Sequence, residues 1–415
     1  MNKKRTELSR RAFMKGAAAL AAAPSVIPAS ALGREGQAAP SERILMGAIG
    51  TGGRGCSLMN ICKRTDPAVE FIAVCDIYEP RQQNGLKIAG EKARVFEDHR
   101  NLLELKEIDA VLIATPEHLH TPQLIDAVTA GKDVYVEKPM THSVEEGVKA
   151  IQVVRQSKQI VQVGMQRRSA PMCLEAKKLV DEGVLGEVSL VRAQWFWNVG
   201  PLPKEAKLQG KFNWDLFLGP APKRPFDSHR ALQWNWYWDY SGGMVTGQGV
   251  HLLDLIQWFM NKGTPRSAAM EGDNYRVGGE TPDVFSASYR YDGFTVSWIL
   301  SYNNSFDNGW KVTFQGTKGT LVIGEPIFAE GETGYRIYKE PWRDVENRKP
   351  IHKSEEGLPT EPHIANWLDC LRTRKEPNAP VEVGHTSSAA CHIAIAALRN
   401  GKTAKLDKDC TKLTV

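Results

Sequence analysis

Residues 44–55 read Ile-Leu-Met-Gly-Ala-Ile-Gly-Thr-Gly-Gly-Arg-Gly, an apolar run of strand length followed at once by the pattern G-x-G-x-x-G. In such a stretch Gly50 permits a tight turn, Gly52 lets the backbone approach a pyrophosphate, and Gly55 lets the following helix pack closely on its strand. The phosphates then lie at a helix N-terminus, where free N–H groups point at them. The predicted dinucleotide site contains Gly50, Gly52, Gly53, Arg54 and Gly55.

A second apolar run, residues 71–75, ends in Asp76, which follows Gly55 by 21 residues. A carboxylate at this spacing accepts hydrogen bonds from the ribose hydroxyls of NAD and repels the 2′-phosphate of NADP. We therefore expect NAD as the cofactor. Arg81, five residues further on, leaves NADP open.

Further apolar runs alternate with segments of helical periodicity, and one of these segments opens with a Ser-x-x-Glu capping box at Ser143. Strands that alternate with helices in this way predict a doubly wound parallel sheet, here a Rossmann domain over residues 41–165. The runs are 110–114, 134–136 and 160–163, and the clearest helical segments are 121–130 and 143–157.

Beyond residue 165 the pattern changes to the alternation of antiparallel strands. We predict a C-terminal α+β domain over residues 166–415 with a large, mostly antiparallel open sheet that binds substrate and supports oligomerisation. An open sheet with one apolar face in water favours a homo-oligomer, either a dimer or a tetramer. The expected hairpins join 285–291 to 294–302 and 310–315 to 320–323, and the expected closing helices are 362–371 and 387–400.

Residues 1–40 have the features of an export signal and linker. Residues 9–15, Ser-Arg-Arg-Ala-Phe-Met-Lys, match the twin-arginine pattern and precede an Ala-rich stretch broken by Pro24 and Pro28. That stretch is too short to span a bilayer as a stable helix. The pattern predicts export by the twin-arginine route to the periplasm, with an uncleaved anchor as the alternative.

The charge balance argues against a nucleic-acid partner. The chain has 53 basic and 48 acidic residues, and residues 1–40 contain seven of the basic and two of the acidic ones. The remainder carries equal numbers of each, so it has no net field to attract nucleic acid or an anionic membrane. The seven cysteines lack the CxxC spacing of zinc or redox sites, so we expect core thiols and no metal.

Residues 137–139, Glu-Lys-Pro, follow the apolar run 134–136 and are expected at the carboxyl edge of the sheet, where open α/β folds bind ligands. Pro139 cannot continue a strand, so it ends the run in a turn. A lysine beside an oxidised nicotinamide has a lowered pKa, which suits Lys138 to accept a hydroxyl proton as hydride leaves. A solvated lysine at a strand end is the alternative.

Together these motifs resemble the glucose-fructose oxidoreductase, inositol dehydrogenase and rhizopine-catabolism (Gfo/Idh/MocA) family over nearly the whole chain after the leader. The resemblance also includes residues 115–120, Thr-Pro-Glu-His-Leu-His, and residues 131–139. It implies NAD(P)-dependent hydride transfer from a sugar, glycoside or polyol, with Lys138 in contact with both substrate and nicotinamide. The implied cofactor residues further include Thr115, Pro116, His120 and Glu137.

The family's second motif, an Asp, three residues and then a His on a glycine-rich loop, has its counterpart in residues 241–254. His251 matches the active-site histidine, while Gly247 stands where the Asp would be. The resemblance makes Lys138 and His251 the catalytic pair, and Gln248 and Asp254 are further substrate candidates. Without the resemblance, a helix cap or a core position explains His251 equally well.

Tryptophans crowd the middle of the chain among Asn and Asp residues. Alternating Trp234, Trp236 and Trp238 would share one face of an extended segment. Flat apolar rings beside polar side chains suit a pyranose, so Trp195 and Trp236 are candidates for the substrate site. An aromatic core or a subunit interface is the alternative.

Three functions remain open on the sequence. The first is a sugar oxidoreductase. The second is a redox-neutral NAD-dependent glycosidase, lyase or epimerase that acts through a transient keto-sugar, and the third is a sugar-binding protein without catalysis. Free nicotinamide nucleotide is scarce outside the cytoplasm, so an exported enzyme is expected to bind its NAD tightly.

Overall fold

The computed structural model describes residues 42–325, 333–341 and 348–415. The twin-arginine segment lies outside the described residues, so the export signal stays a prediction. Within the described ranges, no helix combines the length and the apolar character needed to cross a membrane. Residues 44–415 form one unit, and the boundary expected at residue 165 stays a prediction.

Six parallel strands form the first sheet, in the order β3-β2-β1-β4-β5-β6, which confirms the Rossmann prediction. Strands β4, β5 and β6 are buried along their whole length, which explains their continuous apolar sequences. The strands are β1 (Ile44–Ile49), β2 (Val69–Cys75), β3 (Arg94–Phe96), β4 (Ala110–Ile113), β5 (Asp133–Val136) and β6 (Val161–Val163). The helices between them are α2 (Gly53–Thr65), α3 (Glu79–Ala89), α4 (His99–Leu103), α5 (Glu117–Thr129) and α6 (Val144–Arg155).

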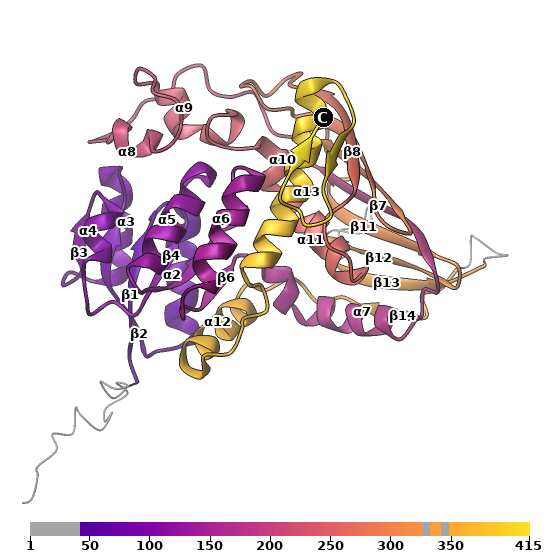
Figure 1. Cartoon of the computed structure of the whole chain (residues 1–415), viewed down its shortest axis with the longest axis horizontal. Coiled ribbons are helices and arrows are strands. Elements are labelled where there is room, and N and C mark those ends of the chain that lie inside the picture. The colour runs from indigo at the N-terminus through magenta and orange to yellow at the C-terminus, as the bar shows by residue number, and fades with distance from the viewer. Residues whose placement is uncertain (1–41, 326–332, 342–347) are drawn as a thin grey trace, which may run out of the picture. The chain divides into compact units, whose positions relative to one another are not determined.

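Ten strands form the second sheet, in the order β14-β13-β12-β11-β7-β10-β9-β8-β15-β16 (Figure 1). All pairs described are antiparallel except β7 with β10, and both predicted hairpins are present. The predicted open, mostly antiparallel sheet is therefore confirmed. The strands are β7 (Val188–Phe196), β8 (Ser267–Asp273), β9 (Val284–Arg290), β10 (Thr295–Ser301), β11 (Gly309–Gly316), β12 (Gly319–Glu325), β13 (Gly334–Lys339), β14 (His352–Ser354), β15 (Ala404–Leu406) and β16 (Leu413–Thr414).

The helices of this half include one that begins earlier than expected. Helix α13 starts at Val381 and not at residue 387, because its first turns pack in the interior although Val, Gly, His and Thr are weak helix formers. The α-helices are α7 (Pro171–Asp181), α8 (Trp214–Leu218), α9 (Ser228–Leu232), α10 (Gly243–Gly247), α11 (Gly249–Phe259), α12 (Glu361–Thr373) and α13 (Val381–Asn400). Two short 3₁₀ helices, η2 (Gln166–Ser169) and η3 (Trp234–Trp236), complete the set.

The tryptophan segment is not extended, so the prediction that Trp234, Trp236 and Trp238 share one face was wrong. Helix η3 turns the chain there, and the Tyr237 N–H donates to the Trp234 carbonyl. Successive even positions in a 3₁₀ helix point in different directions. Trp236 is accordingly buried, while Trp234 and Trp238 are partly exposed.

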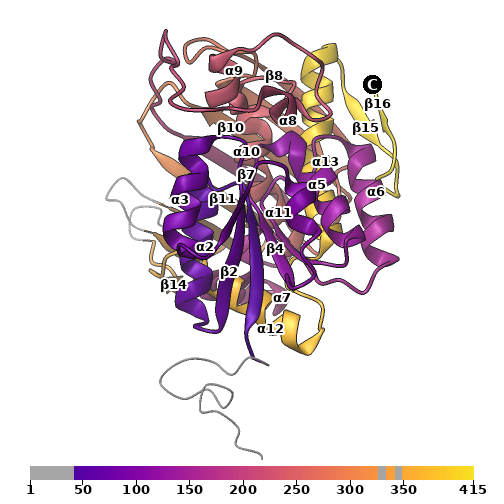
Figure 2. The ribbon, with the colours of Figure 1, turned by 90° about the vertical axis from the view of Figure 1, so that its left-hand side faces the viewer.

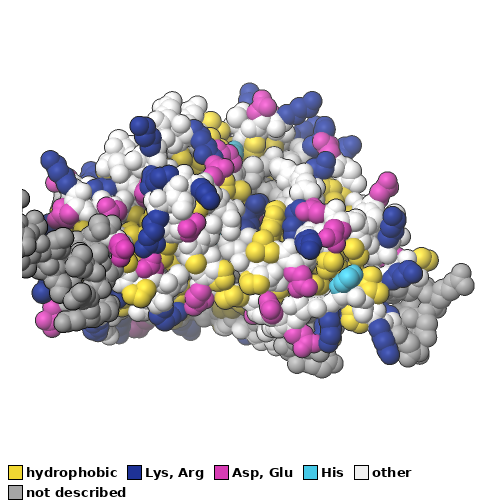
Figure 3. All heavy atoms as spheres, turned by 90° about the horizontal axis from the view of Figure 1, so that it is seen from below, with side chains coloured by type: hydrophobic (Ala, Val, Ile, Leu, Met, Phe, Trp, Pro, Cys, Tyr) yellow, Lys and Arg dark blue, Asp and Glu magenta, His cyan; other side chains and the backbone are white. Residues whose placement is uncertain are grey.

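The outward face of the second sheet is largely polar along β9 and β10. Outward positions of β9 and β10 carry Ser286, Ser288, Arg290 and Ser297, with Ile299 as an exposed apolar exception. Along these two strands the expected apolar open face is absent, and the predicted homo-oligomer stays a prediction. Figure 3 shows basic and acidic side chains interspersed over another face of the molecule, in keeping with the balanced charge.

The cysteines behave as core thiols. Six of the seven are buried, Cys56 is half-buried, and all are free. In the described part of the chain, no three His, Cys, Asp or Glu side chains gather as they would around a metal ion.

Helix α13 joins the two sheets. It contacts α6 on the Rossmann side and α11 and β8 on the other, and Figures 1 and 2 show it beside α6. The approach to α6 is close because Gly147 lacks a side chain: a Cβ there would overlap Nδ1 of the buried His385. That ring is held from its other nitrogen, Nε2, by the Cys410 carbonyl at 2.8 Å.

Gly147→Ala tests this contact. Alanine favours an isolated helix by ~1 kcal/mol, but overpacking a rigid contact costs ~1–3 kcal/mol or more. We expect the clash to prevail and the free energy of unfolding to fall, as measured by denaturant titration. Lys149→Ala, at an exposed position of the same helix, should stay within ~0.5 kcal/mol of the parent. A Gly147→Ala protein as stable as the parent would show that the two helices can separate freely.

Candidate active site

The turn between β1 and α2 is shaped for close approach of a ligand. Gly50 has φ +85°, and a Cβ at this residue would lie 2.7 Å from the Ala114 carbonyl carbon. A Cβ at Gly55 would overlap the Gly50 carbonyl oxygen. Gly52 caps α2 without a side-chain hydrogen bond, so the N–H groups of the first turn remain available to an anion. The turn therefore fits a pyrophosphate.

Asp76 lies at the end of β2, as predicted. Its Oδ2 accepts from the Thr51 N–H at 2.8 Å and its Oδ1 from the Tyr78 N–H at 3.0 Å. Burial raises the pKa of this carboxyl, and the nearby Arg81 guanidinium opposes that rise. Each oxygen keeps a lone pair for a ribose hydroxyl, while Arg81 lines the same cavity and leaves NADP open.

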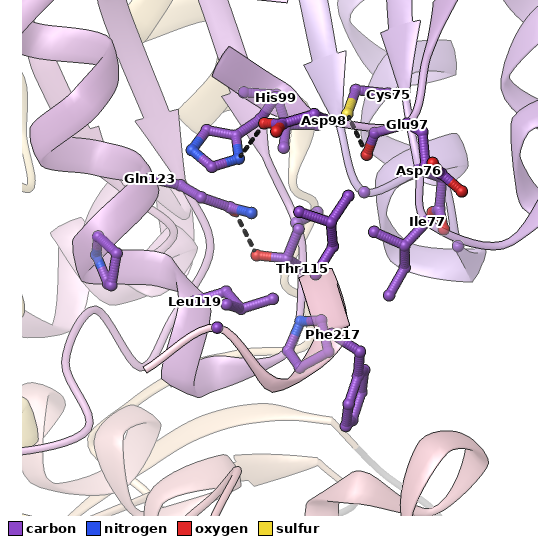
Figure 4. A pocket seen from close by; sticks show the side chains of 18 of the residues that line it. Cys75, Asp76, Ile77, Glu97, Asp98, His99, Thr115, Leu119, Gln123 and Phe217 are labelled. Atoms are coloured by element: carbon purple, nitrogen blue, oxygen red, sulfur yellow. Dashed lines mark hydrogen bonds and ion pairs between the residues drawn. The ribbon is translucent and has the colours of Figure 1, made fainter. Parts of the chain in front are cut away.

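A cavity of about 630 Å³ runs along this edge of the Rossmann sheet. In Figure 4, Asp76 and Ile77 lie on one side of it, Gln123 and His99 on the other, and Phe217 lies below. Both halves of the chain line it. The Rossmann half contributes Gly50, Gly52, Gly53, Arg54, Asp76, Thr115 and Pro116, and the other half contributes Asp215, Leu216, Phe217, Gly219, Pro220, Lys223 and Trp234.

One wall of the cavity comes from residues 209–223, called here the strap segment, which includes α8. Figures 1 and 2 show α8 above the end of the Rossmann sheet. The Asn213 N–H donates to the Ile77 carbonyl at 2.9 Å, and the Glu79 N–H donates to the Lys211 carbonyl at 3.0 Å. These backbone bonds fasten the strap segment to the chain just beyond Asp76.

Three charged side chains meet at the end of β5. Arg54 Nε donates to Glu137 Oε1 at 2.8 Å, which ties α2 to the Glu-Lys-Pro turn. The backbone N–H of Lys138 donates to Glu137 Oε2 at 3.2 Å, and Lys138 Nζ donates to the Gly247 carbonyl at 2.7 Å. Burial lowers the pKa of Lys138, and the carboxyls of Glu137 and Glu117 oppose that shift. The structure thus brings Arg54, Glu137 and Lys138 together.

The Thr115-Pro116 turn lines the cavity, and His120 holds it in place from behind. The two ring nitrogens of His120 lie 2.8 Å from the Thr115 carbonyl and 2.6 Å from the Pro139 carbonyl. Burial lowers the pKa of the ring. His120 therefore links the loop after β4 to the turn after β5, and Thr115 and Pro116 are the members of this group that line the cavity.

His251 lies in the first turn of α11 and is buried. Its pKa is lowered well below the ordinary value by burial and by the positive charges of Lys138, Arg167 and Arg54. The imidazole is therefore neutral at physiological pH. Lys138 Nζ donates to the Gly247 carbonyl, four residues before His251, so the two predicted catalytic residues come from opposite sides of the junction between the two halves.

An aromatic corner, defined as Trp195, Trp197, Trp236 and Tyr302, adjoins His251. The Trp195 ring stacks on His251 with centroids 6.4 Å apart, and the Trp197 ring meets Trp195 edge-on at 5.3 Å. Trp197 is 38 % exposed, so its ring is open to a ligand, whereas Trp195 and Trp236 are buried. Gln248 Nε2 donates to the Tyr302 hydroxyl at 2.7 Å, which adds a polar group to the corner.

The carboxylate of Asp254 forms an ion pair with Arg168 inside the protein. It accepts from Arg168 Nε at 2.9 and 3.0 Å and is buried, so the ion pair joins α11 to the chain after β6. This contact gives Asp254 a bracing role beside the site.

Sequence reasoning passed over three buried residues near Lys138 and His251. Tyr302 belongs to the aromatic corner, but the alternation of residues 294–302 predicted only that its side chain lies in the core. Arg167 stacks on Trp310, with its guanidinium carbon 3.6 Å from the ring centroid. Glu117 lies at the N-terminus of α5, within the motif of residues 115–120. The sequence could not show that its carboxyl is buried.

A Rossmann sheet with an open helix N-terminus after β1 and a carboxylate after β2 defines a class, the NAD(P)-binding Rossmann proteins. Two family models refine it. The model described as "Oxidoreductase family, NAD-binding Rossmann fold" matches residues 44–165, and the "GFO/IDH/MocA C-terminal domain" matches residues 173–322. The chain belongs to the Gfo/Idh/MocA family of NAD(P)-dependent oxidoreductases, as the motifs predicted.

Similar proteins act on varied sugar-like compounds. An inositol 2-dehydrogenase of Rubrobacter xylanophilus is 28% identical over 71% of this chain and 88% of its own. A 2,7-anhydro-N-acetylneuraminate hydratase of Mediterraneibacter gnavus is 25% identical over 74% of this chain and 76% of its own. The WlbA dehydrogenase of Bordetella pertussis, solved with NADH and UDP-GlcNAcA, shares the fold with a TM-score of 0.69 at 23% identity, covering 88% of this chain and 99% of that one.

Gly55→Ala tests the nucleotide turn. The added methyl meets backbone, which cannot rotate away, so the turn must open and nucleotide affinity should fall about 10- to 100-fold. Isothermal titration with NAD, together with chromatography of the nucleotide released on denaturation, measures the loss. Gly263→Ala is the matched control, since a Cβ there meets nothing within 4 Å. Unchanged affinity in Gly55→Ala would place the phosphates elsewhere.

Proposed function

We propose that this protein oxidises a hydroxyl group of a sugar, glycoside or polyol, with Lys138 and His251 as the catalytic residues. The observation that carries the proposal is the geometry around Lys138. Its Nζ donates to the Gly247 carbonyl, and its neighbour Glu137 is paired with Arg54 of the nucleotide turn. His251, four residues after Gly247, stacks on Trp195, which meets the exposed ring of Trp197. Each group has a separate task in such a reaction.

Lys138 is suited to move the hydroxyl proton. When bound, NAD accepts the hydride from the carbon that bears the hydroxyl. Removal of that hydride makes the hydroxyl acidic, and an uncharged Lys138 Nζ can then take its proton. The lowered pKa keeps a larger fraction of the amine uncharged at working pH. The neutral His251 can accept or donate a hydrogen bond at the same oxygen.

The aromatic corner is suited to the substrate's ring. The apolar CH face of a pyranose or cyclitol packs on an aromatic face, and polar groups at its rim hold the hydroxyls. Trp197 offers the exposed face, and the bonded pair of Gln248 and Tyr302 offers rim contacts.

A second function, redox-neutral chemistry on a glycoside, is favoured by the strap segment. A wall fastened across the nucleotide cavity by backbone hydrogen bonds slows exchange of whatever the cavity holds. In a closed cycle the transient ketone acidifies the neighbouring C–H, a group leaves or a centre inverts, and the hydride then returns. A relative named as a hydratase agrees with chemistry that has no net redox change.

We also propose that the protein is exported folded to the periplasm with its NAD already bound. The twin-arginine pattern in residues 9–15 supports this route, because that pathway carries folded proteins.

Lys138→Ala should lower turnover by about 10²–10⁴, the usual contribution of a general acid or base. The predicted pyrophosphate turn before α2 and the ribose-binding Asp76 are untouched, so nucleotide content, measured by absorbance after denaturation, should stay close to normal. Lys178→Ala, at an exposed position of α7, should keep full turnover. Near-normal turnover in Lys138→Ala would remove this residue from the mechanism.

The two functions differ in whether the bound NAD returns to its oxidised state within each catalytic cycle. Pure protein without added coenzyme is incubated with candidate glycosides and polyols while nicotinamide absorbance and products are followed together. For the closed cycle we expect many turnovers, with absorbance that returns to its starting value. Turnover that requires added NAD and accumulates equimolar NADH would instead identify a simple dehydrogenase.

A further inference from the structure

Glu117 is a buried carboxyl that connects the Rossmann half to helix α10. It is the first residue of α5, with 4 % of its surface exposed. Its Oε2 accepts from the Thr246 hydroxyl at 2.8 Å and from the Gly242 N–H at 3.2 Å. One contact is to the residue that caps α10 and the other lies within α10, so together they fix the direction of the turn formed by Gly243–Gly247.

The same turn holds Lys138. Thr246, bonded to Glu117, directly precedes Gly247, whose carbonyl accepts from Lys138 Nζ. Glu117 and Lys138 therefore bind adjacent residues of one turn. Their charges also interact: Lys138 favours the ionised form of Glu117, and Glu117 favours the ammonium form of Lys138.

Position 247 is where the family motif has its Asp, and nothing steric excludes a side chain there. A Cβ at Gly247 would lie 3.9 Å from the Met244 side chain, an ordinary contact. Packing therefore does not explain why this chain lacks a carboxylate at position 247. Glu117 supplies a carboxylate from the opposite side of the same turn.

Other charged groups surround the pair, and they differ in how they are neutralised. Lys138 also interacts with Glu137, Arg54, Arg167 and His251, and Cys391 of α13 interacts with Glu117. Glu137 is already paired with Arg54 at 2.8 Å. Within the described residues, the carboxyl of Glu117 has no arginine partner, so its charge acts mainly on Lys138.

We propose that Glu117 is a positioning residue that replaces the carboxylate missing at position 247: it fixes the Gly243–Gly247 turn and sets the proton affinity of Lys138. Burial raises the pKa of Glu117 to about 7, so its charge changes within the physiological range. The role in catalysis rests on the proposed function, but the coupling between the two side chains can be measured without any substrate.

The test is the pH dependence of Lys138 acylation, measured by competitive labelling with acetic anhydride and mass spectrometry of the NAD-bound protein. Only the uncharged amine reacts, so the midpoint reports the pKa of Lys138. Glu117→Gln keeps an oxygen for Thr246 and Gly242 but removes the charge that favours the ammonium. We expect the midpoint to fall by about 1 pH unit, the low end of the effect of a nearby opposite charge. Exposed Lys207 is the internal reference.

A double variant tests whether a carboxylate at position 247 can take over the effect of Glu117. Glu117→Gln/Gly247→Asp returns a carboxylate to the family's position, and we expect the midpoint to move back toward that of the parent. Glu145→Gln, which removes a carboxylate from an exposed position of α6, should leave the midpoint unchanged. If Glu117→Gln alters turnover equally at every pH and leaves the labelling midpoint in place, Glu117 has a structural role and the proposal is overturned.

If Glu117→Gln fails to fold, the same coupling can be measured on the Glu117 carboxyl in a Lys138 variant. Two interacting sites shift each other's proton affinity equally, so Lys138→Met should raise the pKa of Glu117 by the same amount. Isotope-edited infrared titration of the buried carboxyl measures that value. An unchanged carboxyl titration in Lys138→Met would overturn the proposal. Failure of the sugar reaction with an intact labelling shift would overturn only the proposed function.

Discussion

The hydrogen bond from Lys138 Nζ to the Gly247 carbonyl is the constraint on which the site depends, because its two ends belong to different halves of the chain. Lys138 follows β5 at the carboxyl edge of the Rossmann sheet, and Gly247 ends α10 beside the second sheet. A charged group removed from water must find a partner, so this bond fixes how closely the two halves approach. Helix α13, packed against α6 at Gly147, sets the same approach from another side. His251 on α11 and Glu137, the residue after β5, therefore keep fixed positions around Lys138.

The parts of this arrangement that could be predicted from the sequence are those that local physics determines. Only glycine permits the backbone contacts at Gly50 and Gly55, and strands buried on both faces need unbroken apolar runs. Strand β3 carried no such signal, because two of its three residues are exposed and pairing with β2 defines it. Helix η3 shows a backbone conformation that the sequence did not predict. The identity of Trp236 indicated an aromatic cluster, but long-range packing decided the backbone conformation that distributes the rings.

The contacts that complete the site join residues far apart in sequence, which is why motifs could not reveal them. A His118 ring nitrogen lies 2.7 Å from the Phe217 carbonyl, 99 residues away, and Glu117 meets Thr246 across 129 residues. Both His118 and Glu117 belong to a motif that the sequence displayed plainly. Its resemblance to the family implied a loop beside nicotinamide, and the structure adds that its buried side chains attach the strap segment and α10. One short motif thus positions a wall of the nucleotide cavity and the turn that binds Lys138.

In the proposed closed cycle, this shared attachment connects cofactor retention with proton transfer. The nucleotide beside the strap segment is returned to its starting state in place, and the proton released during oxidation comes back to the same oxygen. One group then serves as base in the first step and as acid in the last, which works best when its pKa lies near the working pH. Burial alone would lower the pKa of Lys138 further and leave mostly the uncharged amine, which is a weaker base, with little of the acid form. The opposing carboxylates of Glu137 and Glu117 limit that fall, and the charge of Glu117 itself varies near neutrality. A buried carboxyl beside the lysine therefore suits proton transfer in both directions of the proposed closed cycle.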